Sequence, residues 1–250
     1  MISCQQSTKS EFKNNFKISE PNLDSIELSN TKNQINKTPK DVTVAPKQNT
    51  ECQYDNEVNS IGIGLIIVPE KFKIYRDNKL SELYGEFNIY REEVSICSKY
   101  FKPDYGILHF VCIERTNKYF KVLVNFSTVL YLENNKENIF TTWNDYILSS
   151  YGIRRLTSNS GEISESQNLK SEPDDKSETL EIPEGYELFC PIEIKKEWLK
   201  VQYDCFYNEE ENPNEGKPCN EYIDKCKNPT VGWIRWKKKN KILIDIFLMP

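Results

Sequence analysis

The chain has 250 residues, of which 38% are hydrophobic and 28% charged, and its 33 basic and 38 acidic side chains give a formal net charge of −5. This acidic balance argues against a general nucleic-acid-binding protein, which would show a basic excess on one face. No apolar run reaches the roughly 18 residues of a membrane-spanning helix, so such a helix is not expected.

The N-terminal stretch 1–57 is predicted to be a disordered tether. It is rich in Lys, Asn, Gln, Ser and Thr, and it holds too few large apolar side chains to offset the entropy lost on ordering. Its start, Met1-Ile2-Ser3-Cys4, resembles the end of a bacterial lipoprotein signal peptide, although the basic and apolar signal regions are missing. Cys4 is therefore the candidate lipidation site, with an ordinary flexible tail as the alternative.

The first folded block is predicted over residues 58–157. Short apolar runs with period-two alternation indicate strands; the main ones lie at 61–68, 106–114, 119–124 and 129–132.

A helix should follow these strands. Thr141 or Thr142 can cap it, and Trp143, Tyr146, Ile147 and Tyr151 form one apolar stripe. The only histidine, His109, alternates within an apolar strand. We therefore expect it to be a packed core residue.

Residues 158–181 are polar and acidic and are predicted to link this block to a second one over residues 182–250. The second block repeats part of the first: the thirteen residues 110–122 align without a gap with 189–201. Each copy reads as strand, turn, strand, which predicts two β modules in tandem. A second hairpin is expected from Gly232–Trp236 to Ile242–Phe247, across the basic turn Lys237–Lys239. We expect that turn to be solvated, with an anionic-ligand patch as the alternative.

The chain contains eight cysteines, and their spacing suits an oxidising compartment. Cys205, Cys219 and Cys226 surround one polar loop, and we expect Cys219 and Cys226 to pair with each other or one of them with Cys205. Cys112 and Cys190 lie in apolar strands and are expected to act as small core residues. Zinc is the rival interpretation, but the spacing lacks a short C-x₂₋₄-C step and no histidine is near. We expect no metal or cofactor.

Two segments resemble the bacterial SH3-like domain. Trp198-Leu-Lys-Val-Gln-Tyr203 followed by Val231-Gly-Trp-Ile234 is similar to that family's aromatic-"kV" strand and Gly-Trp-aliphatic strand. In the first block Tyr119-Phe-Lys-Val122 supplies the "kV" strand, and Val129-Leu-Tyr-Leu132 stands in for the Gly-Trp step. The resemblance implies a mainly β protein of two small SH3-like barrels with one short helix, in a lipoprotein of the Bacteroidetes type.

The aromatic residues around the repeats are the candidate ligand-binding residues. Because side chains alternate along a strand, we expect Trp233 and Trp236 not to point inward together, so that one of them borders an exposed groove. The six candidates are Tyr84, Tyr119, Trp198, Tyr203, Trp233 and Trp236. In the resembled family such grooves contact peptides or cell-wall material.

No nucleophile–base pair or Gly-rich phosphate loop is found in the sequence, so we predict no enzymatic activity. The main hypothesis is a binding protein anchored in the bacterial envelope, periplasmic or at the outer membrane, that recognises a peptide, glycan or protein. The alternative is an immunity or inhibitor lipoprotein that blocks a partner enzyme. If the context of Cys4 is coincidental, a cytoplasmic location follows.

Overall fold

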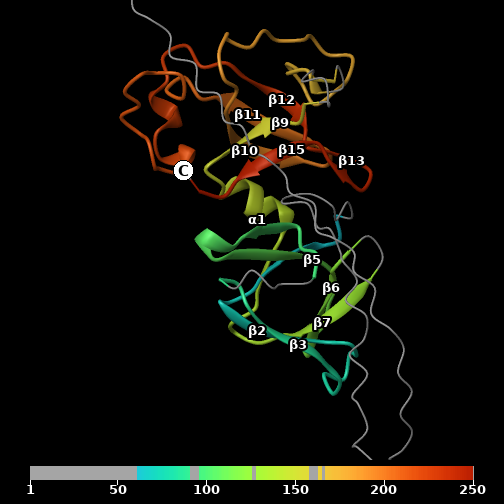
Figure 1. Cartoon of the computed structure of the whole chain (residues 1–250). Coiled ribbons are helices and arrows are strands. Elements are labelled where there is room, and N and C mark those ends of the chain that lie inside the picture. Colours follow the sequence, from blue (N-terminus) through green and yellow to red (C-terminus); the bar gives the residue numbers. More distant parts are fainter. Residues whose placement is uncertain (1–60, 91–95, 126–127, 158–162, 165–166, 250) are drawn as a thin grey trace, which may run out of the picture. The chain divides into compact units, whose positions relative to one another are not determined.

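The computed structural model describes residues 61–90, 96–125, 128–157, 163–164 and 167–249. Within these ranges the chain is mainly β, with antiparallel sheets in two bodies and one short α-helix (Figure 1). The predicted tether 1–57 and the candidate lipidation site Cys4 lie outside the described residues.

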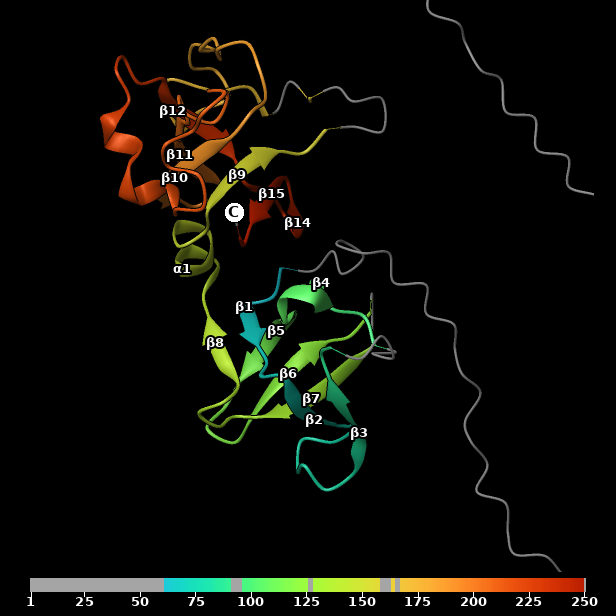
Figure 2. The same ribbon diagram turned by 60° about the vertical axis from the view of Figure 1, so that its left-hand side comes forward.

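The first sheet is antiparallel, and its strands follow the order β3-β2-β7-β6-β5-β1-β8, with β4 paired to β5 (Figure 2). A short 3₁₀ turn at Pro103–Tyr105 leads from β4 into β5. The strands are β1 (Gly64–Ile67), β2 (Lys71–Tyr75), β3 (Leu83–Asn88), β4 (Tyr100–Lys102), β5 (Ile107–Arg115), β6 (Tyr119–Leu123), β7 (Val129–Glu133) and β8 (Ile139–Thr141).

The second sheet has the order β12-β11-β10-β9-β15. A separate two-stranded ribbon, β13 (Lys237–Lys238) with β14 (Lys241–Ile242), forms the basic turn. The five sheet strands are β9 (Gly152–Arg155), β10 (Phe189–Lys195), β11 (Trp198–Tyr203), β12 (Val231–Arg235) and β15 (Ile244–Phe247). Among the described strands, the pairings of each sheet run along an open path and do not close into a ring.

The two sheets contain the same five-strand unit. The order β7-β6-β5-β1-β8 in the first corresponds to β12-β11-β10-β9-β15 in the second. The repeated hairpins agree in detail: the register shifts between Cys112 and Glu114 in β5–β6, and between Pro191 and Glu193 in β10–β11. These are the same two positions of the thirteen-residue repeat, so both copies carry a β-bulge at one place.

The correspondence extends to the strands on both sides of the hairpin. Phe110 lies opposite Ile66 of β1, and its counterpart Phe189 lies opposite Ile153 of β9. On the other side of the hairpin, β6 pairs with β7 in the same register as β11 pairs with β12. The matched pairs include Val122–Leu130 with Val201–Gly232, and Lys121–Tyr131 with Lys200–Trp233. Val129–Leu132 therefore holds in the first sheet the position that Val231–Ile234 holds in the second.

Burial explains why the repeat preserves its apolar positions. Phe110, Phe120 and Val122 of the first copy are at most 1% exposed, and Phe189, Leu199 and Val201 of the second are completely buried. The lysines between them are half-exposed in both copies. Alternation thus places one face of each hairpin in a core and leaves the other to the surface.

The predicted helix is confirmed as α1 (Trp143–Leu148). Thr142 is its N-cap, and its hydroxyl accepts a hydrogen bond of 3.1 Å from the backbone N–H of Asp145. Trp143, Tyr146 and Ile147 are all buried, as their stripe indicates, whereas Tyr151 lies beyond the end of the helix and is half-buried. The indole of Trp143 donates a hydrogen bond to the backbone oxygen of Ile61, which ties the helix to the residues before β1.

The prediction that Gly232–Trp236 forms a hairpin with Ile242–Phe247 is wrong about which strands pair. β12 does not pair with the final strand; the lysine turn forms only the short ribbon β13–β14, and β15 instead pairs with β9. The physical reason is that Trp236 leaves the strand conformation after Arg235, and its break redirects the chain to the far edge of the sheet. A local pattern of alternating residues does not show which distant strand offers the free edge.

The described part of the expected linker packs along β12. We call residues 167–180 the strap. Lys170 exchanges two backbone hydrogen bonds with Trp233, of 2.8 and 2.7 Å, and so caps the outer edge of β12. Leu169 is 1% exposed and anchors the strap. A Cβ built on Gly232 would lie 2.7 Å from Leu169 and 2.8 Å from the backbone oxygen of Lys170, so the glycine allows this close approach.

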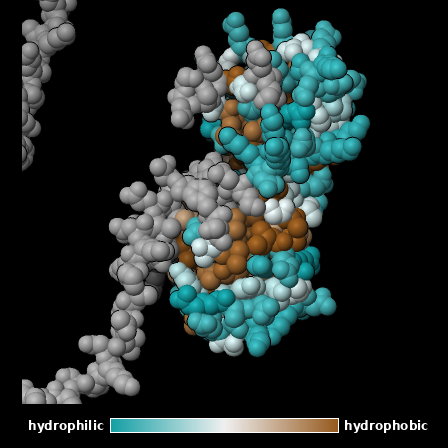
Figure 3. All heavy atoms as spheres, turned by 90° about the vertical axis from the view of Figure 1, so that its right-hand side faces the viewer, coloured by the Kyte–Doolittle hydropathy of each residue, from teal (hydrophilic) through white to brown (hydrophobic). Residues whose placement is uncertain are grey.

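None of the described helices is long or apolar enough to cross a membrane. On the face shown in Figure 3 most of the described surface is hydrophilic; a broad hydrophobic patch lies over the part of the molecule that holds the first sheet, and smaller hydrophobic areas lie on the other part.

Candidate functional site

The six predicted ligand-binding aromatics divide between surface and core. Tyr84 and Tyr119 are half-buried on the first sheet. The other four are largely covered: Trp198 is 8% exposed, Tyr203 6%, Trp233 8% and Trp236 3%. The expectation that Trp233 or Trp236 borders an exposed groove is wrong, because both are buried. Trp236 belongs to the hydrophobic core cluster together with Ile234, whereas Trp233 lies outside that cluster and is covered where Lys170 of the strap pairs with it. The Trp236 indole donates to the backbone oxygen of Lys196 at 2.9 Å.

Half-buried tyrosines line the outer face of the first sheet. Tyr75 lies directly opposite Tyr131, and the Tyr131 ring meets that of Tyr119 edge-to-face with centroids 5.3 Å apart. The Tyr119 hydroxyl donates a 2.7 Å hydrogen bond to Glu114, and this bond raises the pKa of the tyrosine. Rings held in this way present rigid, amphipathic surface of the kind that binding sites use.

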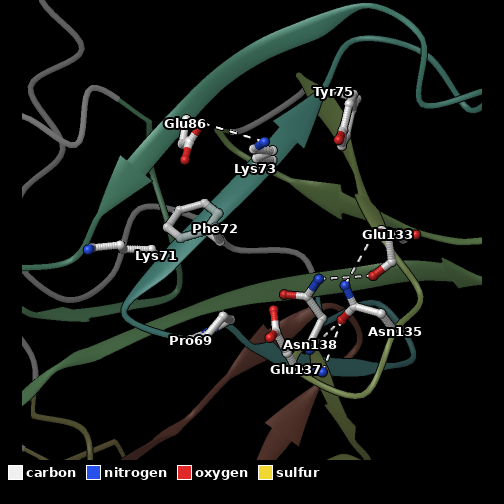
Figure 4. Close-up of a pocket in the computed structure, with 10 residues that line it drawn as sticks. All are labelled: Pro69, Lys71, Phe72, Lys73, Tyr75, Glu86, Glu133, Asn135, Glu137 and Asn138. Atoms are coloured by element: carbon white, nitrogen blue, oxygen red, sulfur yellow. Dashed lines mark hydrogen bonds and ion pairs between the residues drawn. The ribbon is translucent and has the colours of Figure 1, made fainter.

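A pocket opens at the Tyr75 end of this tyrosine row (Figure 4). Its volume is about 180 Å³, which corresponds to about six waters at roughly 30 Å³ each. We call it the Asn138 pocket. β2, β3 and the turn between β7 and β8 supply its walls; the lining residues are Pro69, Lys71, Phe72, Lys73, Tyr75, Glu86, Glu133, Asn135, Glu137 and Asn138.

Asn138 is the unusual residue of this pocket. It is 7% exposed, and its Nδ2 donates a 2.9 Å hydrogen bond to the backbone oxygen of Glu133. Its Oδ1 has no hydrogen-bond partner, and it is the one buried side-chain polar atom of which this is true among the described residues. Exchanging the amide's two ends would set two oxygens against each other at Glu133, so the bond fixes the orientation.

The turn that carries Asn138 is held by another asparagine. Asn135 Oδ1 accepts 3.0 Å hydrogen bonds from the backbone N–H groups of Glu137 and Asn138, an arrangement that asparagine favours in turns. The exposed tip of the turn, residues 135–137, therefore surrounds a buried and fixed amide. Glu133 and Glu137 add carboxylates at the rim, and Lys73 is 3.7 Å from Glu86 across β2 and β3.

The second sheet has a groove at the matching place. We call it the Arg235 groove; its volume is about 620 Å³, and it is lined by Asn168, Lys170, Asp175, Glu197, Arg235, Lys238 and Lys239. Arg235 pairs with Trp198 as Glu133 pairs with Tyr119. Both hollows thus lie at the end of the same strand of the repeat and beside the turn that follows it.

The charges of the two hollows are opposite. Three carboxylates and two lysines line the Asn138 pocket, whereas four cations and two carboxylates line the Arg235 groove. The Arg235 guanidinium lies 4.5 Å from the centre of the Trp198 ring and donates hydrogen bonds to Asp175 and Glu197. The pairing holds the pKa of Asp175 below its ordinary value.

The polar loop of the second sheet is closed by two disulfides, Cys205–Cys226 and Cys190–Cys219. The expectation that one loop cysteine pairs with Cys205 is confirmed, and the alternative of a Cys219–Cys226 bond is wrong. Cys190 is not a free core residue: it faces the loop and binds Cys219, which a spacing argument within the loop could not find. Tyr222 packs beside this bond and donates a 2.7 Å hydrogen bond to Asp204.

The two other reactive side chains of interest are buried in the first sheet. His109 is 8% exposed, contacts the Tyr146 hydroxyl at 2.8 Å and has its pKa lowered to about 4 by burial, so the expected packed histidine is confirmed. Cys112 is the free cysteine of the described residues, and burial raises the pKa of its thiol to about 12. Among the described residues no group of three His, Cys, Asp or Glu is placed to hold a metal.

Comparison with protein-family models, with curated proteins and with solved structures finds no match to this chain. Sequence reasoning did not single out Asn138, Tyr131 or Arg235. The Asn-rich turn after β7 could have drawn attention to the first, since asparagine there stabilises turns. The other two needed the strand pairing to be known.

Proposed function

We propose that this chain is a non-enzymatic binding protein built from two SH3-like units. In an SH3-like unit the first strand pairs with both the second and the last, and the middle three strands form a meander. The order β8-β1-β5-β6-β7 and its counterpart in the second sheet support this assignment. The aromatic-"kV" segments then occupy the third strand of each unit, β6 and β11.

The disulfides indicate an extracytoplasmic protein, since such bonds persist in oxidising compartments. We place it in the bacterial envelope, anchored through a lipid on Cys4. The test is detergent partition of the protein expressed behind a lipoprotein signal, with Cys4→Ala as the variant. The wild type should enter the detergent phase and the variant the aqueous phase; equal partition would contradict the anchor.

The ligand site that we propose is the Asn138 pocket with the adjacent tyrosine row. The observation that carries it is the unpartnered Oδ1 of Asn138. A buried acceptor without a partner costs about 1–3 kcal/mol, so its retention calls for an explanation. A ligand that donates an N–H or O–H to this oxygen supplies one. Because the atom itself is covered, the ligand reaches it through a small movement of the exposed turn 135–137.

The shape and chemistry of the site suit one side chain or sugar ring of a larger ligand. Tyr75 and Phe72 offer ring faces, and Glu133 and Glu137 offer further acceptors. The tyrosine row continues from the pocket across β7 and β6, so the rest of an extended peptide or glycan would lie along it. We therefore propose an envelope peptide, glycan or protein as the partner.

The test is retention of the purified protein on isolated peptidoglycan and on a detergent extract of the envelope. Asn138→Leu removes the acceptor at similar volume, and Tyr75→Ala removes a ring; each should weaken retention by about tenfold or more. Tyr105→Ala is the control, since Tyr105 is 66% exposed and lies outside the pocket. Undiminished retention of both pocket variants would show that the site is wrong. Capture of a single enzyme with loss of its activity would favour the inhibitor alternative.

A further inference from the structure

The Arg235 groove is separate from the Asn138 pocket, and a side chain of the strap contacts the guanidinium within it. Asp175 sits on the Arg235 guanidinium in a bidentate manner, with Nε–Oδ1 3.0 Å and Nη2–Oδ2 2.6 Å. This fork-to-fork geometry is the one by which arginine recognises a carboxylate. Asp175 belongs to the acidic strap.

The guanidinium is held in place without help from Asp175. It lies over the Trp198 ring, and its Nη1 donates a 2.8 Å hydrogen bond to Glu197. The Arg235 side chain is 17% exposed. If Asp175 were removed, Trp198 and Glu197 would therefore still hold the Arg235 guanidinium in place. Its Nε–H and one Nη2–H would then have no acceptor.

Asp175, by contrast, is held loosely. Its side chain is 61% exposed, and it lies in the turn between Lys170 and Thr179, which form an isolated bridge. Exposed ion pairs contribute little to stability, so a competing carboxylate could displace this one without unfolding the sheet. The strap would remain anchored through Leu169 and the edge of β12.

The groove also retains positive charge after Asp175 has docked. Lys238 and Lys239 line it, are exposed, and have no ion-pair partner among the residues that the structure describes. A ligand with two or more carboxylates could therefore place one on Arg235 and another near these lysines. The hollow is large enough for several residues of extended peptide.

We propose that the Arg235 groove binds acidic peptide segments, and that the strap residues 171–178 act as an internal competitor that covers the site. Tethering makes the competitor effective, because a short linker holds it at an effective concentration in the millimolar range. An external acidic segment displaces Asp175 from the groove when it presents more carboxylates than Asp175 alone, or when the strap moves away from Arg235.

The experiment uses the full chain and a fluorescent synthetic peptide with the sequence of residues 171–178. Binding is followed by anisotropy at low salt. Asp175→Asn should tighten binding of the peptide by about tenfold or more relative to the wild type, because it empties the fork. Glu172→Gln makes the same charge change in the same strap away from Arg235, and it should leave binding at the wild-type level.

Two further arms test the chemistry. In the Asp175→Asn background, Arg235→Lys keeps the charge but loses the fork and should weaken binding by about tenfold, and a peptide with Asn in place of Asp175 should bind weakly. Inorganic polyphosphate is the competing probe. Equal effects of Asp175→Asn and Glu172→Gln, or tight binding of polyphosphate with none of the peptide, would overturn the proposal and leave Asp175–Arg235 as a structural ion pair.

Discussion

The hairpins β5–β6 and β10–β11 share their register and bulge, yet the segments attached to them differ almost everywhere. In the first sheet the next strand begins after the short connection 124–128; in the second, residues 204–230 form a loop closed by two disulfides. Before the hairpin the first sheet inserts β2, β3 and β4, whereas the second has the strap. The comparison shows that the repeated strands supply the core, and the connections supply what distinguishes the two units.

The same division applies to the two hollows. Each lies at the end of the strand that follows the repeat, yet Glu133 occupies in one the place that Arg235 occupies in the other. A common framework thus holds two sites of opposite charge.

The largest expected effect tests whether the two cores are equivalent. Val122 and Val201 are matched and completely buried, so Val122→Asp and Val201→Asp should each destabilise their own sheet by several kcal/mol, comparable with the stability of a small domain. We expect two calorimetric transitions, with a different one lost in each variant. The controls are Lys121→Asp and Lys200→Asp, on the outer face. Loss of all cooperative unfolding in either valine variant would contradict two separate units.

The disulfides should stabilise the second sheet alone. Their sequence separations of 29 and 21 residues correspond to about 3–4 kcal/mol each by chain entropy. Cys190 is the counterpart of Val111 in the first sheet, so the double variant Cys190→Val, Cys219→Ala copies the first sheet and should lower only the second transition. Mass spectrometry of unreduced digests would verify the connectivity. A Cys205–Cys219 or Cys219–Cys226 peptide in place of the two bonds would contradict it.

A pH dependence should distinguish the first sheet. Its buried His109 corresponds to Leu188 in the second. The folded state holds the pKa of His109 at about 4, below the ordinary 6.5. Below pH 6.5 the unfolded state therefore binds more protons, so stability is lost as the pH falls from 6.5 towards 4, in total about 3 kcal/mol.

The variant that tests this dependence is His109→Leu, which copies the second sheet. It leaves the Tyr146 hydroxyl without its partner and so lowers stability at every pH. The informative quantity is the slope of the unfolding free energy between pH 6.5 and 5, which should flatten in the variant. His109 is the only histidine of the chain. An unchanged slope in the variant would therefore show that the pH dependence of stability comes from groups other than histidine.

The smallest predicted effect concerns the glycine under the strap. Gly232 corresponds to Leu130, which has no strap beside it. Gly232→Ala would press against Leu169 and the Lys170 backbone, and overpacking of this kind costs about 1–3 kcal/mol. Chemical denaturation should show this loss, and the strap should become more sensitive to protease. A neutral substitution would mean that the strap can move aside without loss.

The sequence was informative where structure is local. The hairpin repeat follows from residues close in the chain, and so does helix α1, whose cap and stripe lie within a few residues. The errors all concern distant partners. Cys190 looked like a core cysteine because nothing nearby shows that it faces Cys219. The pairing of β15 with β9, and the covering of Trp233 by Lys170, depend on segments far away in the chain.

The candidate sites were harder to predict for a related reason. Most of the aromatic residues chosen from the sequence are core residues, since the same amphipathic rings suit a small core and a binding surface. The features that mark the two hollows are relations between residues: an amide oxygen left without a donor at Asn138, and a guanidinium fixed between a ring and two carboxylates at Arg235. Neither can be seen before the strands are paired.

The free thiol of the first hairpin has a consequence for how the chain acquires its disulfides. Cys112 takes the place that Pro191 holds in the second hairpin, and it is completely buried. With a thiol pKa of about 12, on the order of one molecule in 10⁵ carries the thiolate at neutral pH, and the thiolate is the species that attacks a disulfide. Once the β5–β6 hairpin is buried in its core, the Cys112 thiol therefore takes almost no part in thiol–disulfide exchange. The four cysteines of the second sheet can then form their two disulfides without competition from Cys112.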